Sequence, residues 1–180
     1  MSVVIVEGCD GSGKTTLIAN LRKSTKRHFL TLSRNGPPRK PSDLLATLPW
    51  IRDCPPEIDL VCDRHPLISE PIYGPHVRKE TSMVAVVHPT DVKRYLSYVD
   101  KIIYCRPPLR IIKENSRVEI QMPGVSERIE KIVELYDQAM DDLSLAGMTV
   151  IHYDWTGAEL TRRFTGRTAD LEKLFFERRI

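Results

Sequence analysis

One octapeptide near the amino terminus dominates the sequence: Gly8-Cys9-Asp10-Gly11-Ser12-Gly13-Lys14-Thr15. It matches the pattern GxxxxGK[ST] at every fixed position. Glycines allow the backbone to curl so that successive N–H groups point inward and form a cradle for an anion. The helix expected to follow would present its positive N-terminal end to the same anion. The octapeptide therefore predicts a loop that holds the phosphates of a nucleoside triphosphate.

The segments around this loop alternate between strand and helix patterns. Residues 3–6 form a continuous β-branched run, which is typical of a strand buried on both faces of a parallel sheet. Further strand patterns cover 29–33, 58–62, 101–105 and 148–153, and helical patterns cover 15–23, 42–52, 89–98, the stretch after 108, 125–145 and 168–179. Pro66, Pro71 and Pro75 predict irregular chain after the third strand. The alternation predicts one α/β domain over residues 1–180, with a doubly wound, parallel, five-stranded sheet.

The composition is that of an ordinary globular domain. With 180 residues, 41% hydrophobic and 28% charged, the chain is not expected to be disordered. It contains no apolar run near the ~20 residues of a membrane span and no signal peptide, so we expect a cytoplasmic protein without a membrane partner. Four cysteines without a CxxC pair argue against a zinc site. The net charge is only +3, yet seven bases and no acid lie between Leu21 and Ser42, and we expect them beside the phosphate-binding segments.

The class of phosphate-loop protein follows from what accompanies the loop. Motors, GTPases and small kinases all share this loop. The N/T-K-x-D segment with which GTPases recognise guanine is absent from the sequence. The third strand ends in Asp63-Arg64, whereas motor ATPases carry an Asp-Glu pair there. Together with the short chain, this pair favours a small kinase.

Residues 6–16 resemble the phosphate loop of thymidylate kinases, which follows the pattern EGxDGxGKTT. Asp63-Arg64-His65 looks like the DRY motif of that family, and Arg34 is similar to the arginine that meets the acceptor phosphate. Residues 113–128, which include Arg117, lie where the family has its basic lid. The resemblance covers the chain from about residue 1 to 153, and only the loop and the Asp-Arg pair are specific motifs.

This resemblance implies a P-loop NTPase fold with a short lid, ATP-Mg²⁺ as donor and a deoxynucleoside monophosphate as acceptor. It implies donor contacts from Gly8, Asp10, Gly11, Ser12, Gly13, Lys14, Thr15 and Thr16. It implies catalytic roles for Lys14, Asp63, Arg64 and Arg117, Mg²⁺ ligation by Thr15 and Asp63, and acceptor contacts from Asp10, Arg34, Arg64 and Tyr73. Related kinases are often homodimers, which makes a homodimer an expectation here.

The acceptor stays open because the segments that recognise it depart from the family. Residues 35–38 replace an acidic residue and Gly-Gly-Thr, and the Tyr-Gln pair after DRY is missing. One hypothesis is a free deoxynucleoside monophosphate, converted to the diphosphate. The other hypothesis is the hydroxymethyl group of 5-hydroxymethyluracil within DNA, as in the bacteriophage branch that includes 5-hydroxymethyluridine DNA kinases. Asp63 would then serve as the general base for the hydroxyl group. A bacteriophage protein of this kind would act in the host cytoplasm. A nucleotide sensor without transfer is a third hypothesis, weakened by the intact Lys14, Thr15 and Asp63.

Several single residues also have two interpretations. Glu7 is either a second metal or acceptor contact or a buried, hydrogen-bonded carboxylate. The spacing predicts a shared helix face for Arg106, Arg110, Lys113 and Arg117. This face is either a catalytic lid or a solvated basic surface. Base stacking or simple packing is open for His65, Tyr73 and Trp155.

Overall fold

The fold is described from a computed structural model, which places residues 1–33, 36–118, 121–157, 163–164 and 171–176. These residues form a parallel sheet with the strand order β2-β3-β1-β4-β5-β6. The strands are β1 (Val3–Glu7), β2 (Phe29–Ser33), β3 (Asp59–Asp63), β4 (Lys101–Cys105), β5 (Val150–Tyr153) and β6 (Arg163–Phe164). The five predicted strands are confirmed. The two-residue strand β6 is an addition that no sequence pattern indicates.

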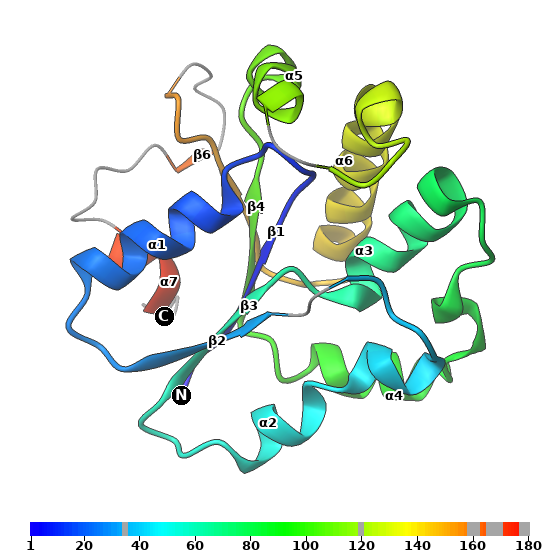
Figure 1. Ribbon diagram of the computed structural model, residues 1–180. Coiled ribbons are helices and arrows are strands. Elements are labelled where there is room, and N and C mark those ends of the chain that lie inside the picture. Colours follow the sequence, from blue (N-terminus) through cyan, green and yellow to red (C-terminus); the bar gives the residue numbers. More distant parts are fainter. Residues whose placement is uncertain (34–35, 119–120, 158–162, 165–170, 177–180) are drawn as a thin grey trace.

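Helices cover both faces of this sheet (Figure 1). They are α1 (Lys14–Ser24), α2 (Leu48–Asp53), α3 (Pro66–Tyr73), α4 (Pro89–Leu96), α5 (Leu109–Val118), α6 (Ile129–Leu145) and α7 (Leu171–Phe176), with short turns η1 (Pro41–Leu45), η2 (Gly74–Arg78), η3 (Met83–Val86) and η4 (Ser126–Arg128). Successive residues of a strand point to opposite faces. Val4 and Val6 therefore join the core under α1 and α7, while Val3 and Ile5 join the core under α3, α4 and α6. The predicted doubly wound arrangement is confirmed.

The segment after β3 differs from the prediction, because its three prolines lie in the helices α3 and η2. Pro66 is in the first turn of α3, where an N–H group has no partner in the helix and its loss costs little. Pro71 lies inside α3 and removes one hydrogen bond of the helix. Ile68 and Ile72 are one turn apart and almost fully buried. We attribute the helix to this burial, which outweighs the single lost bond.

The other helices follow the predicted pattern with small shifts. The predicted helix at 42–52 is divided into η1 and α2, with Pro49 in the first turn of α2. The long helix predicted at 125–145 is observed as η4 followed by α6, and its apolar residues Ile132, Tyr136 and Met140 are fully buried. None of the described helices combines the length and the apolarity needed to cross a membrane.

His65 fixes the start of α3 and connects it to the residue before α2 and to α4. Its Nδ1 accepts a hydrogen bond from the N–H of Leu67 at 3.2 Å, and its Nε2 lies 3.2 Å from Thr47 Oγ1. The hydroxyl of Thr47 lies 2.8 Å from that of Tyr95, whose ring is 4.3 Å from the imidazole. Burial lowers the pKa of His65 to about 3. The imidazole is therefore neutral in the folded protein and acts as a structural acceptor.

We expect this buried histidine to make the protein sensitive to acid. The unfolded chain takes up a proton near pH 6.5, while folded His65 resists protonation until about pH 3. The free energy of unfolding is thus fully retained above pH 6.5 and falls, by up to about 1.4 kcal/mol per pH unit, as the pH decreases toward 3. Urea unfolding of His65→Asn, which keeps a helix-capping side chain, should show a shallower loss between pH 7 and 4. An equal slope in both proteins would contradict this assignment.

Candidate functional site

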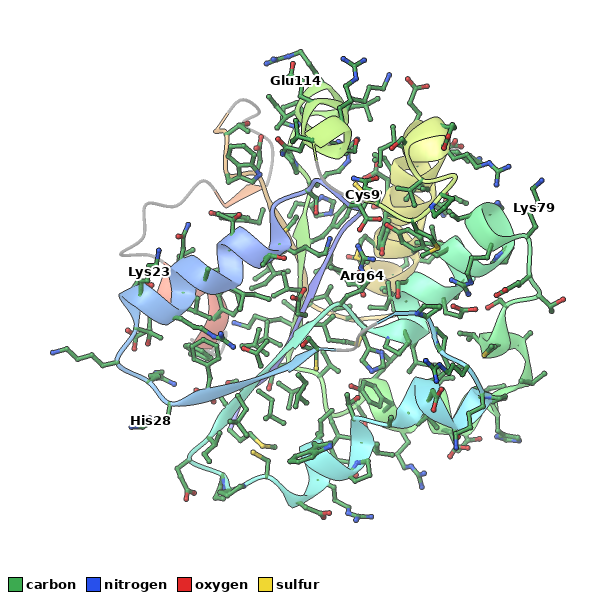
Figure 2. The ribbon with its side chains drawn as sticks, viewed as in Figure 1. Cys9, Lys23, His28, Arg64, Lys79 and Glu114 are labelled. Carbon is green, nitrogen blue, oxygen red and sulfur yellow. The ribbon has the colours of Figure 1, made fainter. Side chains whose placement is uncertain are left out.

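The predicted phosphate loop connects β1 with α1 at the carboxyl ends of the strands. Ligands of open α/β sheets bind outside this edge. Strand β1 pairs with β3 in a register that sets Val6 opposite Asp63, so the loop and the Asp63-Arg64 pair are neighbours. Figure 2 shows Cys9 of the loop and Arg64 close together in the middle of this edge. Two sequence motifs therefore form one site, although the contact between Asp10 and Arg64 spans 54 residues of sequence.

The loop packs so closely on its surroundings that none of its three glycines leaves space for a side chain, as Gly8 and Gly13 illustrate. At Gly8, with φ of 142°, a Cβ atom would lie 2.6 Å from the carbonyl oxygen of Cys105 in β4. At Gly13, with φ of 90°, it would lie 2.8 Å from Nε1 of Trp155. Both positions also have a backbone conformation that L-residues rarely adopt. The loop is thus held in one shape before any ligand arrives.

Two side chains from distant segments hold carbonyl groups of the loop. Nδ2 of Asn115 in α5 donates a hydrogen bond to the carbonyl of Gly11 at 2.8 Å. Nε1 of Trp155, which follows β5, donates to the carbonyl of Ser12 at 3.2 Å. Trp155 is nevertheless 47% exposed. Asn115 was missed by the sequence analysis, because no motif marks it.

The other polar groups of the loop are arranged for a phosphate. Lys14 is buried, and its Nζ donates to the carbonyl of Cys9 at 2.7 Å. Burial and the nearby Arg64 lower the pKa of Lys14. Ser12 Oγ is buried and has no hydrogen-bond partner in the described part of the chain. Thr15 and Thr16 are exposed in the first turn of α1.

These features fit a magnesium–nucleoside triphosphate complex. A narrow cradle of backbone N–H groups and an unpartnered serine hydroxyl suit phosphate oxygens. The hydroxyl of Thr15 and the carboxylate of Asp63 are the hard oxygen ligands that Mg²⁺ prefers. Asp63 is half-buried at the end of β3, and its carboxylate makes no hydrogen bond or ion pair with the residues that the structure describes.

Asp10 is the centre of a cluster that joins the loop to α3. Its Oδ1 accepts a hydrogen bond from Arg64 Nη2 at 3.0 Å, and its Oδ2 accepts one from the hydroxyl of Tyr73 at 2.9 Å. The guanidinium of Arg64 also lies over the ring of Tyr73, 4.9 Å from its centroid. Burial acts to raise the pKa of Asp10, but Arg64 and Lys14 outweigh it and hold the pKa below its ordinary value. Three residues assigned to the acceptor thus lie in direct contact.

A pocket with a volume of about 140 Å³ opens beside this cluster. Its polar wall consists of Asp63, Arg64, Ser69, Glu70, Tyr73 and Arg78. The other side is formed by residues 36–38, the segment that departs from the thymidylate kinase pattern. The divergent segment therefore borders the pocket, as an acceptor-recognition segment would. Arg34, the remaining acceptor residue, lies outside the described residues.

One wall of the pocket is stiffened by an ion pair that the sequence analysis missed. Nη2 of Arg78 lies 2.8 and 2.7 Å from the two carboxylate oxygens of Glu70, and its Nε donates to Glu80 at 2.8 Å. Glu70 is 2% exposed. A Cβ at Gly74 would lie 2.7 Å from the Glu70 carboxylate, so the turn η2 passes close over the pair. Glu70 and Arg78 come together only because η2 continues α3, which no sequence pattern indicates.

The predicted basic face near the lid is largely paired with acids. Arg106 binds both carboxylate oxygens of Asp137, at 2.8 and 3.0 Å. Arg110 pairs with Glu114, and Lys113 pairs with Glu130. Arg117 is exposed in the last turn of α5 and forms no ion pair with any residue in the described ranges. Of the four bases, Arg117 is thus the one that remains available to a ligand, and its catalytic role stays a prediction.

The basic stretch between residues 21 and 42 does not gather at the site as expected. Arg22 and Lys23 lie in the last turn of α1, about 12–14 Å along the helix from Lys14 at its start. Figure 2 shows Lys23 and His28 on the left side of the molecule, away from Cys9 and Arg64 near its centre. Among the described bases of this stretch, Arg39 and Lys40 follow the segment that borders the pocket. The helix carries the first bases away because it starts at the loop and runs toward the opposite edge of the sheet.

Comparison with known proteins supports the fold. No protein-family model matches the chain, and no curated protein matches its sequence. The YorR protein from Bacillus subtilis, in complex with phosphorylated GDP, is similar with a TM-score of 0.60 and 21% identity over 87% of each chain. Deoxyadenosine kinase from M. mycoides, with the products dCMP and dCDP, has a TM-score of 0.56 and 12% identity, covering 96% of this chain and 95% of its own.

A third structure, NadR in complex with NR, has a TM-score of 0.58 and 20% identity. The match covers 97% of this chain and 51% of NadR. Identities this low establish the fold alone. Together with the parallel, doubly wound sheet, these matches show that the chain has an α/β P-loop NTPase fold.

The contact between Gly13 and Trp155 predicts how a substitution would act. In a Trp50→Phe background, Trp155 is the only tryptophan of the chain. Gly13→Ala should lose about 1–2 kcal/mol of stability from its positive φ and should also displace Trp155, which changes its fluorescence emission. Gly147→Ala is a matched control, because Gly147 has the same φ of 90° but nothing within 4 Å of an added Cβ. It should lose stability without an emission change, and an unchanged emission in Gly13→Ala would contradict the described packing.

Proposed function

We propose that the protein is a P-loop kinase that transfers the γ-phosphoryl group of ATP-Mg²⁺ to a deoxynucleoside monophosphate and releases the diphosphate. The observation that carries this proposal is the cluster of Asp10, Arg64 and Tyr73. One carboxylate of the phosphate loop contacts both an arginine and a tyrosine of the adjacent pocket. A donor held in the loop and an acceptor held in the pocket would therefore be neighbours.

The donor side follows from the chemistry of the loop. Lys14 would leave the carbonyl of Cys9 and bind the β- and γ-phosphates, with Ser12 and the backbone N–H groups around them. Thr15 and Asp63 would hold Mg²⁺, which neutralises charge on the phosphates when it is bound. Phosphoryl transfer depends on positioning and electrostatic stabilisation far more than on covalent help from the protein. Arg117 would add positive charge from the lid side.

The acceptor side follows from the pocket. A phosphate monoester is ionised at neutral pH and needs an arginine to position it, but no general base. Arg64 borders the pocket, and only its Nη2 is engaged by the described residues, so its Nη1 retains donors for a ligand. Structures with the same fold have deoxynucleotides, phosphorylated GDP or NR as ligands. They support an acceptor of the nucleoside or nucleotide class.

One observation favours a second acceptor, the hydroxymethyl group of 5-hydroxymethyluracil within DNA. The carboxylate of Asp63 has no partner in the described structure and borders the pocket, as a general base for a hydroxyl group would. The charge distribution favours the smaller acceptor, because Arg22 and Lys23 lie far from the pocket. A DNA duplex would need a basic track that continues from the pocket entrance.

A panel of acceptors distinguishes these two functions. Purified protein is incubated with γ-labelled ATP, Mg²⁺ and either free dTMP, dCMP, dGMP and dAMP or DNA that contains 5-hydroxymethyluracil, with thymine DNA as control. We expect label on a free monophosphate, most of all dTMP, and none on DNA. Label on the modified DNA and on no free monophosphate would overturn the main proposal, and that activity should fall steeply with added salt.

Substitution of the loop lysine tests the donor site independently of the acceptor. Lys14→Ala should lower turnover at least about 100-fold, because it removes the cation expected at the transferring phosphoryl group. Lys23→Ala is the matched control, since Lys23 is an exposed lysine of the same helix at its far end. Its turnover should stay within about twofold. Circular dichroism and thermal melting verify that both variants fold, and full activity of Lys14→Ala would rule out the phosphate-loop role.

A further inference from the structure

Glu7, the last residue of β1, is fully buried and occupies both of its carboxylate oxygens. Oε1 accepts a hydrogen bond from the backbone N–H of His65 at 2.6 Å, and Oε2 accepts one from that of Gly8 at 3.2 Å. Gly8 opens the phosphate loop, whereas His65 follows Arg64 and caps α3. A single carboxylate thus connects the donor loop to the turn that leads into the pocket. Of the two sequence interpretations of Glu7, the structure has the buried, hydrogen-bonded carboxylate.

The turn that Glu7 holds has a strained backbone. Arg64 has φ of 65°, a left-handed conformation that costs free energy in any residue other than glycine. Such a conformation persists only where surrounding contacts impose it. The flanking N–H groups supply these contacts, because the N–H of Arg64 binds the carbonyl of Val6 at 2.9 Å and the next N–H binds Glu7. Glu7 is the only side chain in this set, since the other contact is between backbone groups.

The left-handed turn sets the direction of the Arg64 side chain. With this backbone, Nη2 reaches both the carbonyl of Gly8, at 3.2 Å, and Oδ1 of Asp10. The guanidinium then lies between the loop and the pocket, over Tyr73. Burial raises the pKa of Glu7, and the positive charges of Arg64 and Lys14 nearby act against this effect.

We propose that Glu7 is a positioning residue: its carboxylate imposes the left-handed conformation of Arg64 and thereby aims the guanidinium at the acceptor beside the phosphate loop. The expected effect on affinity for the acceptor rests on the proposed function. The effect of Glu7 on the conformation of Arg64 rests on geometry alone. Glu7 itself lies beneath the site and touches neither substrate. It acts on the reaction through Arg64.

The test combines Glu7 variants with Arg64→Gly. Glu7→Gln keeps one of the two side-chain oxygens that accept backbone N–H groups, and Glu7→Leu keeps neither. The KM for dTMP should therefore rise in that order, about tenfold or more in Glu7→Leu. The KM for ATP should change less than about threefold. Glycine adopts the left-handed conformation without strain and carries no guanidinium. In the Arg64→Gly background, where there is nothing left to aim, the Glu7 variants should leave the KM for dTMP unchanged.

Asp59→Asn is the matched control, because Asp59 is a buried carboxylate of the same sheet that accepts a backbone N–H, from Ser2, at 2.6 Å. It should lower stability without changing the KM for dTMP. Equal changes in both KM values, or Glu7 effects that persist fully in Arg64→Gly, would overturn the positioning role. The relaxed glycine backbone also provides a folded background if Glu7→Leu alone does not fold.

If the wild-type protein does not use dTMP, the proposed function is refuted. The positioning role of Glu7 is then tested by structure instead of by kinetics. Crystal structures of Glu7→Gln and of Glu7→Leu in the wild-type background, or of Glu7→Gln alone if the leucine variant does not fold, then decide it. We expect Arg64 to leave the left-handed region and Nη2 to separate from Asp10. An Arg64 that keeps its φ and its contact with Asp10 would overturn the inference.

Discussion

Close contact between the phosphate loop and its neighbours is the constraint on which the site depends. The backbone of β4 comes so near to Gly8 that a Cβ there would lie 2.6 Å from a carbonyl oxygen, and Trp155 comes equally near to Gly13. A loop packed in this way cannot shift independently of the sheet. The fixed loop consequently sets the positions of the side chains that bind its carbonyl groups, which include Asn115 in α5 and Arg64 after β3. The preorganised cradle is a property of the packing as much as of the glycines.

Acidic side chains lie beside the bases of the site before any nucleotide binds. Lys14 is buried and Arg64 is half-buried, Asp10 forms an ion pair with Arg64, and the carboxyl group of Glu7 lies beneath them. Buried ions of one sign would be costly without partners of the opposite sign. A triphosphate that enters this cluster meets carboxyl groups as well as bases, so it must obtain compensation from backbone N–H groups, from a divalent cation and from the lid. This explains why both Mg²⁺ and a free arginine such as Arg117 fit the proposed reaction.

The sequence predicts the parts of the site that depend on short-range patterns. The glycine spacing of residues 8–15 specifies a loop between strand and helix, and Asp63 follows a recognisable strand, so both lie where expected. Contacts that depend on packing between distant segments were not predictable. The bond from Asn115 to Gly11 spans 104 residues, and nothing about this asparagine distinguishes it from a surface residue of α5.

The proline-rich segment shows a second limit of the sequence patterns. Local rules indicate irregular chain, whereas the burial of Ile68 and Ile72 against the core favours a helix that tolerates Pro71. The helix, with η2 behind it, brings Glu70 and Arg78 together and directs Tyr73 at Asp10. Most of the pocket side of the site, where we propose that the acceptor binds, thus results from a tertiary effect that overrides a local preference.

Cys9, the second residue of the loop, gives the protein an internal chemical probe. Burial raises the pKa of its thiol to about 11, so almost none of it is the reactive thiolate at neutral pH. An alkylating reagent can reach this sulfur only when the loop breaks its packing contacts with β4, α5 and Trp155. The rate of alkylation at Cys9 consequently reports how often the loop opens locally. A bound triphosphate that stabilises the closed loop would lower that rate.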